Sequence, residues 1–213
     1  MRLSEKYRPQ SLRDIVGQPP IHYLMALARD PYAKCLLLEG PPGCGKTCAA
    51  LAFANDIGTH EHDLIVVNGS DLSVDAAKNY WRGQLRYMPR NAGTWKVLVI
   101  EELEWLSPQT QTLLKTGLER DMPPSTIVIA TSNGVTKLSK AILQRFTMYH
   151  FSGGPTFAAA SVERLQKIWR QEAGNAPVPH SLPEWGWDGD EFSLRVALDQ
   201  LQDHLTISKG VCV

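Results

Sequence analysis

Four runs of consecutive hydrophobic residues stand out along the first two-thirds of the chain, at 35–38, 64–67, 97–100 and 127–130. Their starts are 29, 33 and 30 residues apart. Short, largely branched runs are typical of strands that are buried on both faces. A spacing near thirty residues is the repeat of strand, crossover helix and parallel strand. We therefore predict a doubly wound parallel α/β sheet, with a fifth strand at 147–151.

The segments between these runs carry helical patterns. The spacing predicts helices over 48–57, 74–88 and 107–118. In sheets of this kind ligands bind where the strands end, so we expect the functional site at that edge.

The pattern changes near Ser152-Gly-Gly-Pro155, and no strand-like run of comparable quality follows residue 151. Beyond it the sequence predicts a helix over 157–173, a loop rich in proline and tryptophan over 177–187, and a helix over 191–205. We therefore expect two domains, a five-stranded core and a small helical lid, at 1–152 and 153–213.

Composition narrows the function classes. Among 213 residues, 22 Lys and Arg balance 22 Asp and Glu, which excludes a globally basic nucleic-acid-binding surface. The chain lacks an apolar run of 18 residues and starts with a polar segment, so we expect a cytoplasmic protein without membrane contact. Cys35, Cys44, Cys48 and Cys212 show no C-x-x-C spacing, so the sequence suggests neither a zinc site nor a disulfide framework.

A glycine-rich segment with the pattern G-x-x-x-x-G-K-T directly follows the first predicted strand. Glycines let the backbone approach phosphate oxygens, and the amides of the following helix face the anion. A lysine and a threonine in this pattern reach the β- and γ-phosphates and Mg²⁺. The alternative is a Gly/Pro turn before an ordinary helix. We predict that ATP is bound by Gly40, Pro41, Pro42, Gly43, Cys44, Gly45, Lys46, Thr47 and Cys48, with Mg²⁺ on Thr47.

Polar side chains end the third and fourth predicted strands. We interpret Glu101 as a ligand that holds Mg²⁺ through water and Glu102 as the residue that polarises the attacking water. Asn133 ends the fourth run and can orient that water against the γ-phosphate. The alternative for the two glutamates is a pair of solvated acids that leave the strand.

At this point the sequence resembles a known family, through Glu5-Lys-Tyr-Arg-Pro9, Asp14-Ile-Val-Gly-Gln18, the phosphate loop, Asn68-Gly-Ser-Asp71 and Leu143-Gln-Arg145. These motifs resemble the AAA+ ATPases and, among them, the small subunits of sliding-clamp loaders of the replication factor C type. The resemblance covers most of 4–150 and continues more weakly through 191–202. The phosphate loop alone would not single out this family, whereas the other motifs are considerably more specific.

The resemblance implies roles for matching positions. It implies that Asn68 contacts and gates the water-polarising Glu102, and that Asn133 occupies the sensor-1 position. The residues that it implies around the adenine are Tyr7, Arg8, Pro9, Val16 and Gly17.

Two arginines also match the family. Arg145 stands where the family has an arginine finger that completes the ATP site of the neighbouring subunit, and Arg195 matches a sensor-2 residue on the γ-phosphate. The alternatives are a surface arginine at a helix end for Arg145 and a salt-bridged helix arginine for Arg195.

Three features depart from the family pattern. Glu101 replaces the usual Asp, which could weaken the placement of Mg²⁺ because that ion demands near-octahedral geometry. Gln144 stands where the family has Ser before the finger. The sequence ends at Val213, at the end of the predicted lid, whereas clamp-loader subunits carry a further helical collar domain.

A basic stripe is the candidate nucleic-acid contact. Lys78, Arg82 and Arg86 recur every four residues, which predicts one face of a helix. The resemblance places this helix near the inner surface of an assembled spiral, where DNA lies. The alternative is a solvated basic stripe, and we interpret Trp81 and Tyr87 as packing residues.

The leading hypothesis is an ATP-hydrolysing AAA+ switch that uses Mg²⁺ and acts as an oligomer on DNA, most like a clamp-loader subunit. Its expected partners are other AAA+ subunits, a sliding clamp, and primer-template or other duplex DNA. One alternative is a motor or regulator for recombination or mobile elements. Another is a subunit that holds ATP structurally and hydrolyses nothing.

Overall fold

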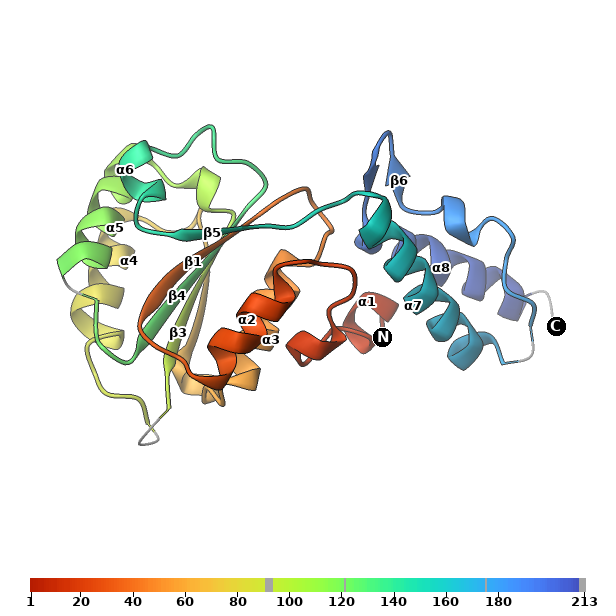
Figure 1. Ribbon diagram of the computed structural model, residues 1–213, viewed down its shortest axis with the longest axis horizontal. Coiled ribbons are helices and arrows are strands. Elements are labelled where there is room, and N and C mark those ends of the chain that lie inside the picture. Colours follow the sequence, from red (N-terminus) through yellow and green to blue (C-terminus); the bar gives the residue numbers. More distant parts are fainter. Residues whose placement is uncertain (91–93, 121, 175, 211–213) are drawn as a thin grey trace.

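The computed structural model describes residues 1–90, 94–120, 122–174 and 176–210. Its centre is a sheet of parallel strands with the order β2-β3-β4-β1-β5 (Figure 1). The predicted doubly wound α/β fold is therefore confirmed. The strands are β1 (Lys34–Glu39), β2 (Leu64–Asn68), β3 (Lys96–Glu101), β4 (Thr126–Ser132) and β5 (Thr147–His150).

Strand burial follows position in the sheet. All seven residues of the central strand β4 are buried, as predicted for a strand covered on both faces. The prediction was wrong for β2, where Val66 is 45% exposed. The reason is that β2 lies at an edge of the sheet.

Helices cover both faces of the sheet (Figure 1). The short α1 (Leu3–Lys6) comes first, α2 (Ile21–Arg29) and α3 (Lys46–Asp56) cover one face, and the opposite face carries α4 (Val74–Asn79), α5 (Pro108–Arg120) and α6 (Lys140–Leu143). Each face has its own hydrophobic core. In α3 the buried residues include Ala49, Ala50 and Ala52, whose small side chains let this helix lie close to the sheet.

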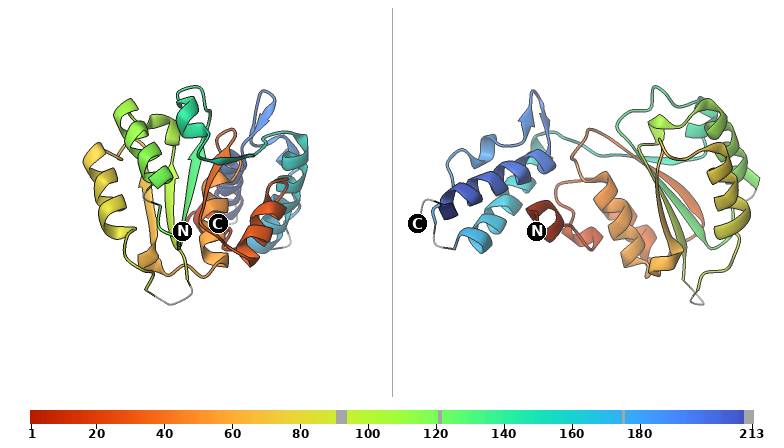
Figure 2. Two further views of the ribbon diagram at one scale, coloured as in Figure 1. Left: turned by 60° about the vertical axis from the view of Figure 1, so that its left-hand side comes forward. Right: turned by 180° about the vertical axis from the view of Figure 1, so that it is seen from behind.

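The C-terminal part holds α7 (Pro155–Ala173), α8 (Leu194–Gly210) and the short hairpin β6 (Trp187–Asp188) and β7 (Glu191–Phe192). Phe157 of α7 packs edge-on against Phe192, with ring centroids 5.7 Å apart. Seen from behind in Figure 2, α1 lies between this helical part and the core.

Two predicted helices differ from the observed ones by more than two residues at an end. The helix expected over 74–88 is an α-helix only to Asn79 and continues as a π-helical turn, Tyr80–Gln84, in which Leu85 N–H bonds Tyr80 O at 2.9 Å. Gly83 has a low helix propensity and Pro89 disfavours helical geometry in the residue before it, which explains the early end.

The helix expected over 191–205 begins only at Leu194, because Glu191–Phe192 pairs with Trp187–Asp188. Gly189 and Asp190 form the two-residue hairpin turn between these strands, with Gly189 at φ +58°. No helix of the described residues is long and apolar enough to cross a membrane.

Candidate active site

The strand register assembles the site edge. β1 and β4 pair so that Glu39 lies beside Ser132, and β2 and β3 pair so that Asn68 lies beside Glu101. Because all these strands run in the same direction, their carboxyl ends meet at one edge. The segment that follows β1 is the predicted phosphate loop, which therefore lies among these polar strand ends.

The phosphate loop bends through glycines in left-handed conformations. Gly43 has φ +79° and Gly45 has φ +95°, a region that side chains disfavour. A Cβ at Gly45 would meet no atom within 4 Å, so this glycine opens onto free space. At Gly43 a Cβ would lie 2.0 Å from Ser193 Oγ, so that glycine makes room for the lid.

Lys46 begins α3 and is only 7% exposed. Its ammonium donates to the carbonyls of Gly40 (2.6 Å) and Pro41 (2.7 Å) and to Asn133 Oδ1 (3.0 Å). Burial lowers the pKa of Lys46, and the nearby thiol of Cys44 and carboxylate of Glu104 act in the opposite direction. The loop carbonyls and Asn133 thus place one cation at the head of the helix.

The acidic pair leaves β3 in two different conformations. Glu101 ends the strand, whereas Glu102 is the only described non-glycine residue with positive φ, at +55°. Such a backbone is costly for a side-chain-bearing residue and is common at functional sites. Asn68 Nδ2 donates to Glu102 Oε2 at 3.3 Å, so the contact implied by the resemblance is present, while its gating role stays a prediction.

Asn133 lies directly after β4 and faces Lys46. Behind it, the buried Glu104 accepts hydrogen bonds from Asn133 N (3.1 Å), Asn133 Nδ2 (3.0 Å) and Ser132 Oγ (2.8 Å). Asn133 therefore joins a buried carboxylate to the lysine of the phosphate loop.

A cleft of about 390 Å³ joins these groups to the N-terminal segment and the lid. Its lining includes both glutamates after β3, Asn133 and the loop from Pro42 to Cys48. The other predicted residues that line it are Tyr7, Arg8, Pro9, Val16 and Arg195.

Four predicted site residues lie outside the cleft lining. Gly40 and Pro41 contribute carbonyls that hold Lys46 instead. Gly17 packs against α7, where an added Cβ would lie 2.9 Å from the backbone of Phe157. Arg145 follows α6 and forms an ion pair with Glu119 of α5.

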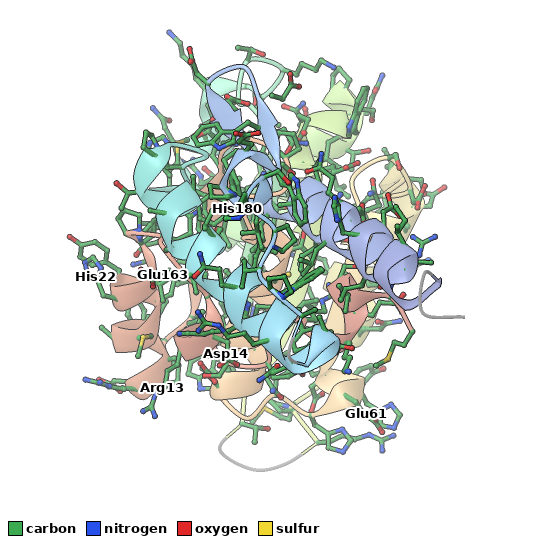
Figure 3. The ribbon with its side chains drawn as sticks, turned by 90° about the vertical axis from the view of Figure 1, so that its right-hand side faces the viewer. Arg13, Asp14, His22, Glu61, Glu163 and His180 are labelled. Atoms are coloured by element: carbon green, nitrogen blue, oxygen red, sulfur yellow. The ribbon has the colours of Figure 1, made fainter. Side chains whose placement is uncertain are left out.

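Lid side chains hold the N-terminal segment in place. Arg164 of α7 donates to the carbonyls of Tyr7 and Asp14, each at 2.9 Å. Figure 3, viewed from the lid side, labels Asp14 below α7, which carries Glu163, the neighbour of Arg164. The Tyr7 hydroxyl donates to Glu172 at 2.6 Å, further along the same helix. We call the end of the cleft lined by this N-terminal segment the base end, because the resemblance implies the adenine base there. Side chains of the lid therefore hold the base end in place.

Two further contacts tie the phosphate loop to the segment before α7 and to the start of α8. Gln18 is 6% exposed and donates from Nε2 to Cys44 O (3.0 Å) and Ser152 O (2.8 Å). Leu194, the first residue of α8, donates its N–H to Gly43 O at 3.2 Å. These bonds therefore couple the position of the phosphate loop to the last residue of the core, Ser152, and to the first residue of α8.

The arrangement fits a nucleoside triphosphate with Mg²⁺. Open space at Gly45 lies before the N-terminus of an 11-residue helix, where amides and dipole favour phosphate. Thr47 and Glu101 line the same cleft and offer the oxygen ligands that Mg²⁺ prefers. The apolar side chains of Ile15 and Leu198 line it as well and suit a base.

The basic stripe is not one α-helical face. Lys78 lies on α4 and pairs with Asp75 at 3.5 Å, whereas Arg86 is exposed in the turn after the π-helical segment. The side chain of Arg82 lies outside the described residues. Trp81 packs against Gly117 as predicted, but Tyr87 is 73% exposed, so its interpretation as a packing residue was wrong.

Sequence reasoning did not assign Glu104, Arg164 or Gln18. Glu104 had a signal, because it lies two residues after Glu102 and is the third glutamate within 101–104. Gln18 ends the motif Asp14-Ile-Val-Gly-Gln18, but the resemblance implied no role for its side chain. Arg164 had no local signal, since its partners are backbone carbonyls about 150 residues away in sequence.

Comparison with known proteins places the chain in a family. Residues 36–153, more than half of the chain, match the family described as "ATPase family associated with various cellular activities (AAA)". The chain is 29% identical over 211 residues to a replication factor C small subunit of Thermofilum pendens, covering 97% of this chain and 63% of that one. It is 30% identical over 203 residues to the Sulfurisphaera tokodaii counterpart, covering 93% and 61%.

Solved structures show the same fold. The Thermotoga maritima RuvB Holliday junction branch migration motor superposes with a TM-score of 0.69 at 25% identity, over 95% of this chain and 67% of that one. A DNA polymerase III gamma subunit-related protein of the same organism gives 0.61 at 14% identity, over 85% and 57%. The chain thus belongs to the AAA family of ATPases and spans less than two thirds of the length of the replication factor C relatives named above.

Proposed function

We propose that this AAA-family chain binds and hydrolyses ATP with Mg²⁺ and acts on DNA as part of an oligomer, most like a clamp-loader subunit. One observation carries the proposal: a single cleft gathers the phosphate loop, Glu101, Glu102, Asn133 and the lid residue Arg195. Sequence identity of 29% and 27% to two replication factor C small subunits, over 97% and 98% of this chain, supports the clamp-loader class.

Within this cleft the residues divide the work. The phosphate-loop amides and Lys46 bind the β- and γ-phosphates, Thr47 and Glu101 hold Mg²⁺, and Glu102 polarises the attacking water. When held by Thr47 and Glu101, Mg²⁺ would neutralise charge on the phosphates. Asn133 orients the water. Arg195, on a lid helix, contacts the γ-phosphate and so couples its presence to the position of the lid.

The proposal is tested by steady-state phosphate release at increasing protein concentration, with and without primer-template DNA. We expect specific activity to rise with concentration and with DNA. A dilute monomer with full activity would contradict the oligomeric part, and no phosphate release under any condition would favour a subunit that only holds ATP.

Arg145 is the proposed finger for a neighbouring site. It lies outside the cleft lining and is held by Glu119, consistent with service in trans. Mixing Arg145→Ala with Glu102→Gln gives a direct test, because each variant alone lacks one part of every site. Mixed particles should regain hydrolysis at interfaces that join an intact Glu102 to an intact Arg145. No recovery in verified mixed particles would refute the assignment.

The DNA contact is proposed to run through Lys78, Arg82 and Arg86. Contacts to phosphates release counterions, so affinity should fall with salt in proportion to their number. Replacing all three residues by Ala should reduce both affinity and the salt slope and leave ATP binding intact. Because Asp75 already pairs with Lys78, we expect Arg86→Ala to cost more than Lys78→Ala.

A recombination motor is the second candidate, favoured by the structural likeness to RuvB. Four-way junction DNA would then stimulate hydrolysis more than primer-template DNA does. A sliding clamp as partner, which the clamp-loader class implies, would instead stimulate hydrolysis only together with primer-template DNA. We also propose the division of the chain into 1–152 and 153–213, with residues 211–213 outside the described part.

A further inference from the structure

A buried carboxylate lies behind the candidate site. Glu104 is 9% exposed and belongs to the 3-10 turn Leu103–Trp105 that follows the acidic pair. It does not line the cleft, yet it accepts hydrogen bonds from Asn133 and Ser132 at 2.8 to 3.1 Å. Across the described ranges of the chain, no Lys, Arg or His forms an ion pair with it.

Hydrogen-bond chemistry fixes how Asn133 is oriented. An ionised carboxylate only accepts, so Glu104 must face the NH₂ group of Asn133. An ammonium only donates, so Lys46 must face the amide oxygen, at 3.0 Å. Glu104 and Lys46 therefore require the same orientation of the Asn133 amide, with its nitrogen toward Glu104 and its oxygen toward Lys46.

We propose that Glu104 is a positioning residue that holds the Asn133 amide with its oxygen toward the cleft. Asn133 then acts as an acceptor, for the Lys46 ammonium and for a hydrogen of the attacking water, rather than as a donor to the γ-phosphate. The catalytic part of this inference rests on the proposed hydrolysis of ATP. The orientation of the amide does not depend on it.

The choice of a carboxylate follows from this role. A glutamine of the same size could accept through its oxygen or donate through its nitrogen, so it would remove one of the two constraints that keep the Asn133 amide from reversing. Burying a carboxylate is costly. Two N–H donors of Asn133, and the Ser132 hydroxyl that Glu104 shares with the Gly134 carbonyl, offset part of that cost. Replacing Glu104 by Gln should therefore affect catalysis more than the binding of ATP.

The test compares Glu104→Gln and Glu104→Asp with Glu61→Gln, a control at an exposed carboxylate. We expect Glu104→Gln to lower the hydrolysis rate about tenfold or more while ATP affinity changes less than about threefold. Combining it with Asn133→Ala should be no slower than Asn133→Ala alone, because the two residues act as a unit. Glu104→Asp keeps an acceptor-only group and should retain more activity than Glu104→Gln.

A second readout is independent of hydrolysis. The side-chain amide signals of Asn133, identified by their loss in Asn133→Ala, should show one hydrogen-bonded proton in the parent and move in Glu104→Gln. If the parent hydrolyses no ATP, the proposed function fails, and these signals still decide the positioning role. Parent signals typical of a solvated amide would overturn the inference without any Glu104 variant. Parental hydrolysis with unmoved signals in folded Glu104→Gln would overturn it equally.

Discussion

The two ends of the cleft are built in different ways. The phosphate end comes from consecutive residues, a strand followed by a glycine loop and a helix, and Lys46 is held there by backbone carbonyls. The base end is assembled from residues 7–9 and 14–16, which Arg164 and Glu172 of the lid hold in place.

This difference separates binding strength from communication. The phosphate end has its charge and glycine geometry fixed locally, so we expect it to supply most of the ATP affinity. The base end depends on bonds from α7, so we expect it to link occupancy to the position of the lid. Gly43 joins the two, because its carbonyl accepts from Leu194 and its missing Cβ admits Ser193.

The largest effect should come from the phosphate end. Lys46→Ala removes a charge-assisted contact to phosphate and should weaken ATP binding at least about 100-fold. Equilibrium binding of a fluorescent ATP analogue measures this. Unchanged affinity in a folded Lys46→Ala protein would sink the assignment of the phosphate end.

Chemistry at the same end should be separable from binding. Glu102→Gln removes only the polarisation of water, so hydrolysis should fall about 100-fold or more with ATP affinity nearly unchanged. Phosphate release and binding, measured on the same preparation, check both halves. Glu101→Gln should instead raise the Mg²⁺ concentration that is required. Hydrolysis by Glu102→Gln at the parental rate would show that the roles are wrong.

The base end should respond more weakly and more selectively. Arg164→Gln loses charge-assisted bonds to two carbonyls and should weaken ATP binding about tenfold, with little effect on tripolyphosphate. Arg170→Gln, at an exposed arginine of the same helix, is the matched control. Equal losses for ATP and tripolyphosphate would mean that Arg164 does not act through the base end.

Raising the pH should lower ATP affinity a few-fold through the phosphate end and leave the base end unchanged. Burial lowers the pKa of Lys46 from its ordinary 10.5, whereas burial raises that of Tyr7 above 10.0. As pH rises through the lowered pKa, Lys46 loses its charge and phosphate binding weakens, while Tyr7 stays neutral. As the pH is raised, affinity for ATP should therefore begin to decrease before pH 10.5 is reached. Lys46→Arg should flatten that decrease because arginine stays charged. A fall of the same size in Lys46→Arg would point to another group.

The same division explains what the sequence could predict. The phosphate loop and the buried strands are encoded by neighbouring residues, so the pattern located them within a few positions. Arg164 and Gln18 act on backbone groups far along the chain, which leaves no periodic signal. The π-helical turn after Asn79 and the hairpin at Gly189 changed helix bounds because local glycine and turn chemistry prevailed over hydrophobic spacing.

Calorimetric titration with ATP and Mg²⁺, set beside adenosine, tests the central claim most directly. We predict one saturable ATP site per chain, with adenosine binding at least about 100-fold more weakly because it lacks the groups that the phosphate end recognises. Adenosine binding as tightly as ATP, or no saturable ATP binding, would contradict the account.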